Sequence, residues 1–126
     1  GYLLSSYSAR RLGLETTGNA GGHHNLLIEP NLSGGLEEII KTMTTGLVVT
    51  NLIGYGVNTV NGDYSRGANG FWVENGEIQY PVSVLTVAGN LKNILLRILL
   101  VCNDWDKNST IHSGSILIDD MMVAGQ

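Results

Sequence analysis

Two Asn-Gly pairs, each placed after a short apolar segment, constrain the fold of this chain more than any other feature. Asn61-Gly62 follows residues 57–60, and Asn75-Gly76 follows the apolar residues 71–73. Asn-Gly readily adopts the positive φ angles that tight β-hairpin turns require. After the second pair, residues 77–80 alternate between polar and apolar side chains, as in a half-buried strand. The pattern predicts antiparallel hairpins.

Further apolar segments extend this prediction along the chain. Segments rich in β-branched and apolar residues predict strands at 25–29, 47–53, 82–88, 115–118 and 121–124. Helical spacing of apolar residues predicts helices within 2–14, over 36–45 and from Leu91 to about Leu99. Gly13 and Gly46 are expected to end the first two helices, and Asn90 is expected to cap the third. The predicted fold class is α+β and mainly β, an antiparallel sheet or barrel-like domain with two or three short helices.

The composition limits the class of protein. The chain has 126 residues, 17 of them glycine, with 14% charged residues and a net charge of −4. An acidic chain lacks the surplus of cations that direct nucleic-acid binding needs. The longest apolar run, 94–102, contains Arg97 and is too short to span a membrane. One cysteine excludes an internal disulfide framework and fits a reducing compartment. Because the first residue is Gly1 rather than methionine, we expect residues 1–126 to be a single domain of a larger protein.

Glycine- and histidine-containing segments offer two candidate sites. The loop 18–22 matches neither phosphate-binding glycine fingerprint and follows no strand, so it indicates a mobile or interface loop. His23 and His24 are adjacent, and adjacent strand residues point to opposite faces, so they rarely share one metal. A metal site built from these two, His112 and Cys102 stays open as an alternative to ordinary surface or hydrogen-bonded histidines.

Two other patterns depart from the motifs that they resemble. Asp104 begins a run like a calcium loop, but Ser109 and Ser115 occupy the positions of the required glycine and glutamate, so turn residues are the simpler interpretation. Ser65 lacks the glycine two residues before it that a nucleophile elbow needs, and no base can be assigned to it. Cys102 follows an apolar run and is expected to be a buried, inert thiol.

Arg66 is the strongest binding candidate that the residues themselves offer. It lies in a segment dense in hydrogen-bonding groups, between two predicted strands. A guanidinium group can clamp a carboxylate or a backbone carbonyl. The alternative is an internal salt bridge with Asp63 or Glu74. The residues alone therefore indicate a binding or structural module, with no catalytic constellation.

Several stretches resemble a known family as they stand: Ser-Tyr-Ser-Ala-Arg-Arg-Leu-Gly-Leu (6–14), Thr-Gly-Asn-Ala-Gly-Gly (17–22), Gly-Asp-Tyr-Ser-Arg-Gly-Ala (62–68), Phe-Trp-Val-Glu-Asn-Gly-Glu-Ile-Gln-Tyr-Pro-Val (71–82) and Ala-Gly-Asn-Leu-Lys (88–92). Together they resemble the C-terminal region of the PmbA, or TldE, branch of the TldD/TldE family, long labelled modulators of DNA gyrase. The resemblance runs from Tyr2 to Gln126.

This resemblance implies a cytoplasmic protein with an N-terminal α/β region and this β-rich C-terminal domain. It also implies a heterodimeric metalloprotease, in which TldD and TldE together mature peptides and degrade small unfolded polypeptides. The zinc histidines of the family belong to an HExxxH helix of TldD, upstream of the matching region. TldE-type proteins are the non-catalytic half. This chain contains no HExxxH and no HE dipeptide, so the resemblance implies no catalytic residue and no cofactor here, with zinc in a TldD-type partner.

The resemblance also places candidate site residues. In TldD, a cysteine that precedes a glycine near the end of the protein is a further metal ligand. The corresponding position in this sequence lies near Ser113, which precedes Gly114. Serine is a poor zinc ligand, so no metal is assigned here, and the neighbouring His112 is the alternative. For a peptide-handling partner, the expected substrate-facing or interface residues are Asn19, Asn25, Tyr64 and Arg66.

Three functions are open on these grounds. The first is a non-catalytic subunit domain that binds peptide or unfolded polypeptide and pairs with a TldD-type subunit, with a homodimer possible in isolation. The second is a non-proteolytic, protein-binding modulator of DNA gyrase or of a toxin–antitoxin pair, without direct DNA contact. The third is an independent metallopeptidase whose metal helix lies outside this chain. Whether the protein is an enzyme therefore depends on sequence beyond these residues.

Overall fold

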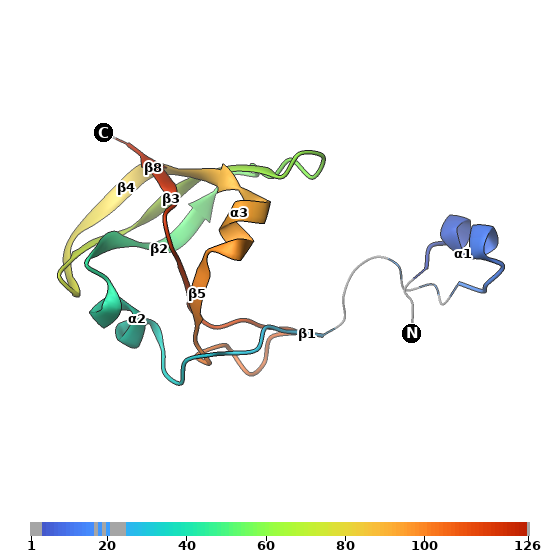
Figure 1. Cartoon of the computed structure of the whole chain (residues 1–126), viewed down its shortest axis with the longest axis horizontal. Coiled ribbons are helices and arrows are strands. Elements are labelled where there is room, and N and C mark those ends of the chain that lie inside the picture. The colour runs from blue at the N-terminus through green and yellow to red at the C-terminus, as the bar shows by residue number, and fades with distance from the viewer. Residues whose placement is uncertain (1–3, 17, 19, 21–24, 126) are drawn as a thin grey trace.

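The computed structural model describes residues 4–16, 18, 20 and 25–125. Its largest unit is a four-stranded antiparallel sheet in the order β2-β3-β4-β8 (Figure 1). The strands are β2 (Thr45–Ile53), β3 (Asp63–Glu74), β4 (Glu77–Asn90) and β8 (Met122–Ala124). The prediction of a mainly β, antiparallel domain with short helices is confirmed, although the sheets of the described residues do not close into a barrel.

The Asn75-Gly76 pair forms the predicted tight turn. Asn75 has φ 51° and Gly76 has φ 76°, which are the two positive angles of a type I′ turn. Glu74 and Glu77 are opposite each other on either side of it. This hairpin joins the two longest strands of the molecule.

The Asn61-Gly62 pair lies in a wider turn than predicted, and residues 57–60 do not form a strand, although the Asn58 amide donates to the Asp63 carbonyl across this turn. Val57 forms only an isolated bridge with Tyr64. The side chain of Asn58 accepts a hydrogen bond from the Val60 amide, and the Asn58 carbonyl accepts one from Gly62. These local bonds satisfy the backbone within a turn. Residues 63–68, predicted to lie between strands, are the first half of β3.

Two small sheets complete the β structure. β5 (Ile98–Val101) pairs antiparallel with β7 (Ile116–Ile118), and β1 (Leu26–Leu27) pairs parallel with β6 (Ile111–His112). β5 and β6 were not predicted. The apolar run 94–102 is compatible with either a helix or a strand, because a short buried run shows no periodicity that distinguishes these two secondary structures.

Two or three short helices were predicted, and each of the three in the described residues is shorter than the segment expected for it. α1 (Ser6–Leu12) ends at Gly13, which has φ 66° as predicted. α2 (Leu36–Thr42) ends at Met43, so Gly46 does not end it and lies instead in β2. α3 (Leu91–Leu96) begins after Asn90, whose side chain accepts from the Lys92 amide, as predicted.

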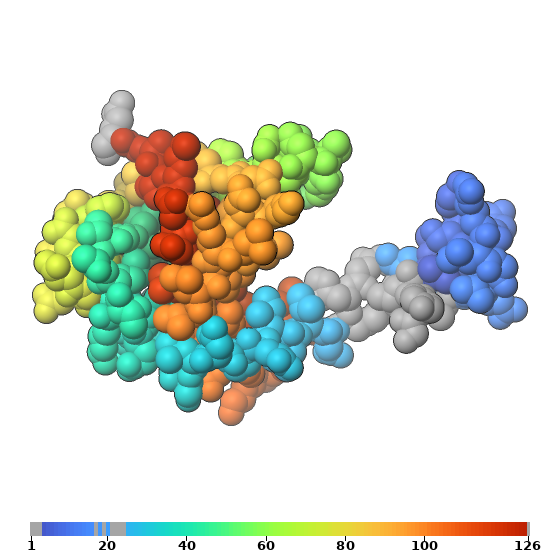
Figure 2. All heavy atoms as spheres, viewed as in Figure 1, coloured from blue at the N-terminus to red at the C-terminus, as the bar shows by residue number. Residues whose placement is uncertain are grey.

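The core lies between α2 and the sheet. Ile40 of α2 packs with Val48 of β2 and Val73 of β3, and Met43 and Phe71 pack against this cluster. α1 lies apart from the sheets (Figures 1 and 2). None of the helices in the described ranges is long and apolar enough to cross a membrane.

Candidate functional site

The first candidate site is built from the start of β3 and the loop 54–62 that precedes it. Tyr64 and Arg66 are two residues apart in β3, so their side chains lie on the same face of the sheet. The Ser65 amide donates to the Gly56 carbonyl over 2.8 Å, which holds the loop against the strand. A Cβ atom on Gly56 would overlap the Ser65 carbonyl oxygen and would also lie 3.4 Å from Cγ of Arg66. Glycine is therefore required where the loop crosses Arg66.

Arg66 has no anionic partner among the described residues. The carboxylate of Asp63 accepts from the Asn61 side-chain amide at 2.7 Å, and that of Glu74 accepts from the Trp72 indole at 3.0 Å. The salt bridge that sequence reasoning offered as the alternative is therefore not formed. Nε of Arg66 is buried and has no hydrogen-bond partner within the part of the chain that the structure describes. Because no carboxylate of the described residues pairs with this cation, its guanidinium group is a candidate for binding an oxygen of a ligand.

The loop itself presents two apolar side chains. Tyr55 is 90% exposed and Val60 is 95% exposed. The loop extends beyond the end of the sheet (Figure 1, green). Isolated exposed apolar residues are common on proteins. Here they lie on the same loop that Gly56 fixes beside Arg66, so the loop belongs to this candidate site.

Asn25, a further predicted site residue that the structure describes, does not join this candidate site. Asn25 is exposed and immediately precedes β1, which belongs to a different sheet and lies at the opposite end of the body from the loop 54–62 (Figure 1). Asn19 lies outside the described residues, as do His23 and His24. Of the predicted site residues that the structure describes, it brings together Tyr64 and Arg66.

A second cluster joins α2 to the segments 102–104 and 113–115. The Asp104 carboxylate accepts from the Leu36 amide at 3.2 Å, and from both the amide and the hydroxyl of Ser115 at 2.7 Å. The Gly34 amide donates to the Asn103 side chain at 3.0 Å. Gly35, the N-cap of α2, has no side chain that could satisfy these amides. Asp104 is thus a helix cap supplied from a distant segment rather than a simple turn residue.

Sequence reasoning missed this capping role. The one available signal was Gly35 itself, because a helix that begins after glycine has no local cap and needs a distant acceptor.

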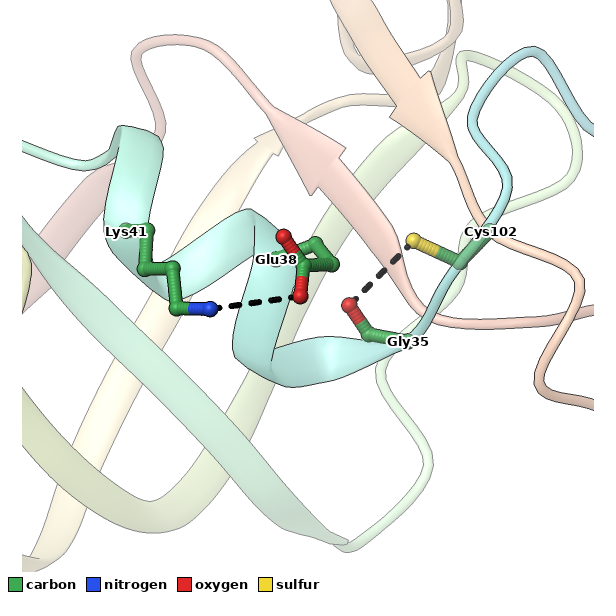
Figure 3. A network of polar contacts seen from close by, with 4 residues as sticks. All are labelled: Gly35, Glu38, Lys41 and Cys102. Atoms are coloured by element: carbon green, nitrogen blue, oxygen red, sulfur yellow. Dashed lines mark hydrogen bonds and ion pairs between the residues drawn. The ribbon is translucent and has the colours of Figure 1, made fainter.

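Cys102 lies beside this cluster and is fully buried, as predicted. Burial, followed by the charges of Asp104 and Glu38, raises the pKa of its thiol. The thiol donates to the Gly35 carbonyl at 3.5 Å, and Glu38 pairs instead with Lys41 at 3.3 Å (Figure 3). A buried thiol with a raised pKa is a poor nucleophile and a poor metal ligand.

His112 does not gather metal ligands around it. Its ring stacks on Trp105, with centroids 5.8 Å apart and planes 7° from parallel. Ser113 donates only to the adjacent Gly114 carbonyl, at 3.4 Å. No group of three or more His, Cys, Asp or Glu side chains that could hold a metal occurs among the described residues.

Acid should weaken the cap that Asp104 provides. Burial acts to raise the pKa of Asp104, but hydrogen bonds from Ser115 and Leu36 outweigh it and hold this pKa below its usual value. A carboxylate whose pKa is lowered by folding stabilises the fold at pH values above its unfolded-state pKa, which is near 4. This contribution is lost as the pH falls through the folded-state pKa. Because the side chain is solvent-exposed, the contribution is about 1 kcal/mol.

We therefore expect Asp104→Asn to lower the free energy of unfolding by about 1 kcal/mol at pH 7 and by almost nothing at pH 2.5. Urea unfolding of both proteins across this range measures the difference. Asp106→Asn at an exposed position is the control, because among the described residues the Asp106 carboxylate accepts only from the amide of Asn108, two residues away. A constant difference across the whole range would contradict the assigned titration.

Comparison with known proteins gives the chain a family. Residues 1–125 match the PmbA/TldA metallopeptidase C-terminal domain. The chain is 58% identical over 126 residues to Metalloprotease PmbA of Escherichia coli, and 56% identical over 124 residues to the Metalloprotease PmbA homolog of Haemophilus influenzae. These matches cover 99% and 98% of this chain. The chain spans 28% of the length of each relative.

Two solved structures share the fold. A protein of Bacteroides thetaiotaomicron superposes with a TM-score of 0.87 at 30% identity, covering 99% of this chain and 28% of that one. A protein of Thermotoga maritima gives a TM-score of 0.80 at 37% identity, covering 98% of this chain and 30% of that one. Both are described as candidate modulators of DNA gyrase. The family match over nearly the whole chain and the identity to its members lead to one conclusion: this chain belongs to the PmbA/TldD metallopeptidase family and corresponds to its C-terminal domain.

Proposed function

We propose that this chain is the C-terminal domain of a cytoplasmic TldE-type subunit, which binds extended peptides and completes a metalloprotease with a TldD-type subunit. Zinc and the catalytic groups belong to that partner in this proposal. The relatives are named metalloproteases, while this sequence has no HExxxH motif. A binding role is therefore the contribution that this domain makes to proteolysis.

The observation that carries the proposal is the state of Arg66. Its guanidinium has a buried Nε without a partner, and no carboxylate of the described residues pairs with it. A peptide offers carbonyl oxygens along its length and a carboxylate at its end, and both suit a guanidinium group. Tyr55 and Val60 on the adjoining loop offer apolar contact to a peptide side chain or a partner subunit.

The test uses the full-length protein that contains this domain, combined with a TldD-type subunit and a fluorogenic unfolded peptide. We expect Arg66→Ala to lower kcat/KM by at least tenfold, mainly through KM, because one charge-assisted hydrogen bond is worth about 1.5–3 kcal/mol. Arg66→Lys keeps the charge but loses the planar fork, so partial activity is expected.

Lys92→Ala is the matched control, because it removes a charge from an exposed side chain at the start of α3. Size-exclusion chromatography separates loss of binding from loss of assembly. If Arg66→Ala left both assembly and peptide cleavage unchanged, the assignment of Arg66 would be wrong.

The description of two structural relatives as gyrase modulators favours a second function, a non-proteolytic contact with gyrase. The net charge of −4 makes a protein surface, rather than DNA, the partner in that case. Gyrase supercoiling measured with and without the full-length protein, in the absence of a TldD-type subunit, tests it. A change in supercoiling without peptide cleavage would favour this function over the first.

A further inference from the structure

A cavity of about 360 Å³ lies between α3 and the chain that leads into β8. We call it the α3 cavity. Its walls come from the end of β4, from α3 and from the segment 120–122. Figure 1 shows α3, in orange, beside the red chain that enters β8. The volume lies at the lower end of the range for small-molecule sites, so the α3 cavity suits a small ligand rather than a folded segment.

One cation and one carboxylate meet in the wall of this cavity. The Arg97 guanidinium donates from Nη1 to Oδ2 of Asp120 at 2.7 Å and to the Asp120 carbonyl at 3.1 Å. Both residues belong to the lining. Their side chains are 49% and 77% exposed, so a ligand can reach them. The α3 cavity therefore presents a positive and a negative group side by side.

The ion pair leaves binding capacity on both partners. A guanidinium group has five N–H donors, and the two bonds to Asp120 start from a single nitrogen. A carboxylate has two oxygens, and Arg97 binds one of them. The remaining donors of Arg97 suit a ligand carboxylate, and Oδ1 of Asp120 suits an ammonium group. Because the two charges of the pair cancel, electrostatic complementarity favours a ligand that also carries both charges.

The backbone around the ion pair is held in place before a ligand binds. The Arg97 amide donates to the Asn93 and Ile94 carbonyls, in each case at 3.1 Å. The Arg97 carbonyl accepts from the Asp119 amide at 2.9 Å. Asp120 has φ 57°, a left-handed conformation that aspartate tolerates. Binding therefore does not have to order the segments that carry the two charges, which favours affinity.

The other side chains of the α3 cavity suit an apolar group. Ile94, Met121 and Met122 belong to its lining. Methionine is unbranched and flexible, so a wall with two of them adapts to apolar side chains of different shape. Asn93 also lines the cavity and lies four residues before Arg97 in α3, on the same face of the helix. Its amide adds a donor beside the guanidinium group.

We propose that the α3 cavity binds a free α-amino acid with an apolar side chain, such as leucine. The carboxylate of the amino acid binds Arg97 and Asn93, its ammonium group binds Asp120, and its side chain packs against Met121 and Met122. Arg66 does not line this cavity. The proposal is therefore independent of the peptide-binding function proposed for Arg66.

The contact between Arg97 and Asp120 selects an amino acid over a peptide. Their charged groups touch at 2.7 Å, so the two charges of a ligand that binds both must also lie close together. An α-amino acid carries its ammonium and carboxylate groups on one carbon atom. A dipeptide separates them by a peptide unit and fits the pair less well.

The ligand class is tested by saturation-transfer difference NMR on the full-length protein that contains this domain. Leucine should give a saturable signal with a Kd of about 1 mM, as expected for so small a ligand. Leucine amide, N-acetylleucine and the dipeptide Gly-Leu each lose one charge or separate the two, so each should bind about fivefold more weakly. The absence of a saturable leucine signal, or equal binding by any of the three analogues, would overturn the proposal.

Variants of the full-length protein test the location of the site. Asp120→Asn removes the negative charge but keeps a residue that tolerates positive φ, so leucine should bind about fivefold more weakly. Arg97→Lys keeps the positive charge but loses the planar fork, so binding should weaken about threefold. Lys92→Ala is the control, because Lys92 belongs to α3 but does not line the α3 cavity, and binding should change less than about twofold.

Circular dichroism of each variant separates loss of binding from loss of fold. Asp120→Asn is the decisive variant, because it changes neither the size of the side chain nor the backbone that it requires. Leucine binding that is unchanged by both Asp120→Asn and Arg97→Lys in folded protein would place the amino acid elsewhere and overturn the proposal.

Discussion

Replacing Gly114 by alanine is expected to lower the free energy of unfolding by about 3 kcal/mol, the upper end of the cost of overpacking. The added Cβ would overlap the Cys102 carbonyl oxygen and lie 2.7 Å from Oδ1 of Asp104. Neither neighbour can move freely. The Cys102 amide is bonded to Ser115, and the Asp104 carboxylate holds both Ser115 and the first turn of α2. The clash therefore affects the β5–β7 pair and the helix together.

Urea denaturation of Gly114→Ala measures this loss, and Ser113→Ala is the adjacent control. The Ser113 hydroxyl makes only a long bond of 3.4 Å to the Gly114 carbonyl. Its loss should cost less than about 1 kcal/mol. Equal stability of the two variants would show that the packing around Gly114 is looser than described.

Gly56→Ala is expected to have the second-largest effect, about 2–3 kcal/mol, and to act at the candidate site. The added Cβ would overlap the Ser65 carbonyl oxygen, which belongs to a paired strand and cannot give way. The loop 54–62 must then lift from β3 and break the bond from the Ser65 amide to the Gly56 carbonyl. Hydrogen exchange at Ser65 should accelerate, and peptide binding at Arg66 should weaken with it.

Gly54→Ala is the control for this variant. Gly54 has φ 77° and no atom within 4 Å of an added Cβ, so alanine there meets backbone strain of about 1–2 kcal/mol but no clash. It should leave exchange at Ser65 nearly unchanged. Equal acceleration in both variants would mean that strain anywhere in the loop, rather than contact at Gly56, controls its attachment.

The fold was predictable where local chemistry decides it. Asn75-Gly76 forms the expected turn, Gly13 ends α1, and Asn90 caps α3. Each of these depends on the residue itself and on neighbours within one turn. The strand predicted before Asn61-Gly62 does not form, because Asn58 accepts hydrogen bonds from Val60 and Gly62 and holds these residues in the turn itself.

The sites were less predictable because they depend on distant pairings. Arg66 was identified from its chemistry. That it has no anionic partner among the described residues could not be predicted, because the carboxylates of Asp63 and Glu74 accept hydrogen bonds from Asn61 and Trp72 instead. Asp104 caps a helix 68 residues earlier in the chain.

The central claim is that this chain belongs to a peptide-binding subunit whose protease activity needs a TldD-type partner. Cleavage of an unfolded fluorogenic peptide by the full-length protein alone, by the TldD-type subunit alone and by the two together, each with and without a metal chelator, tests it most directly. The claim requires cleavage by the combined subunits that the chelator abolishes, and none by the full-length protein alone. Chelator-sensitive cleavage by the full-length protein without its partner would contradict it.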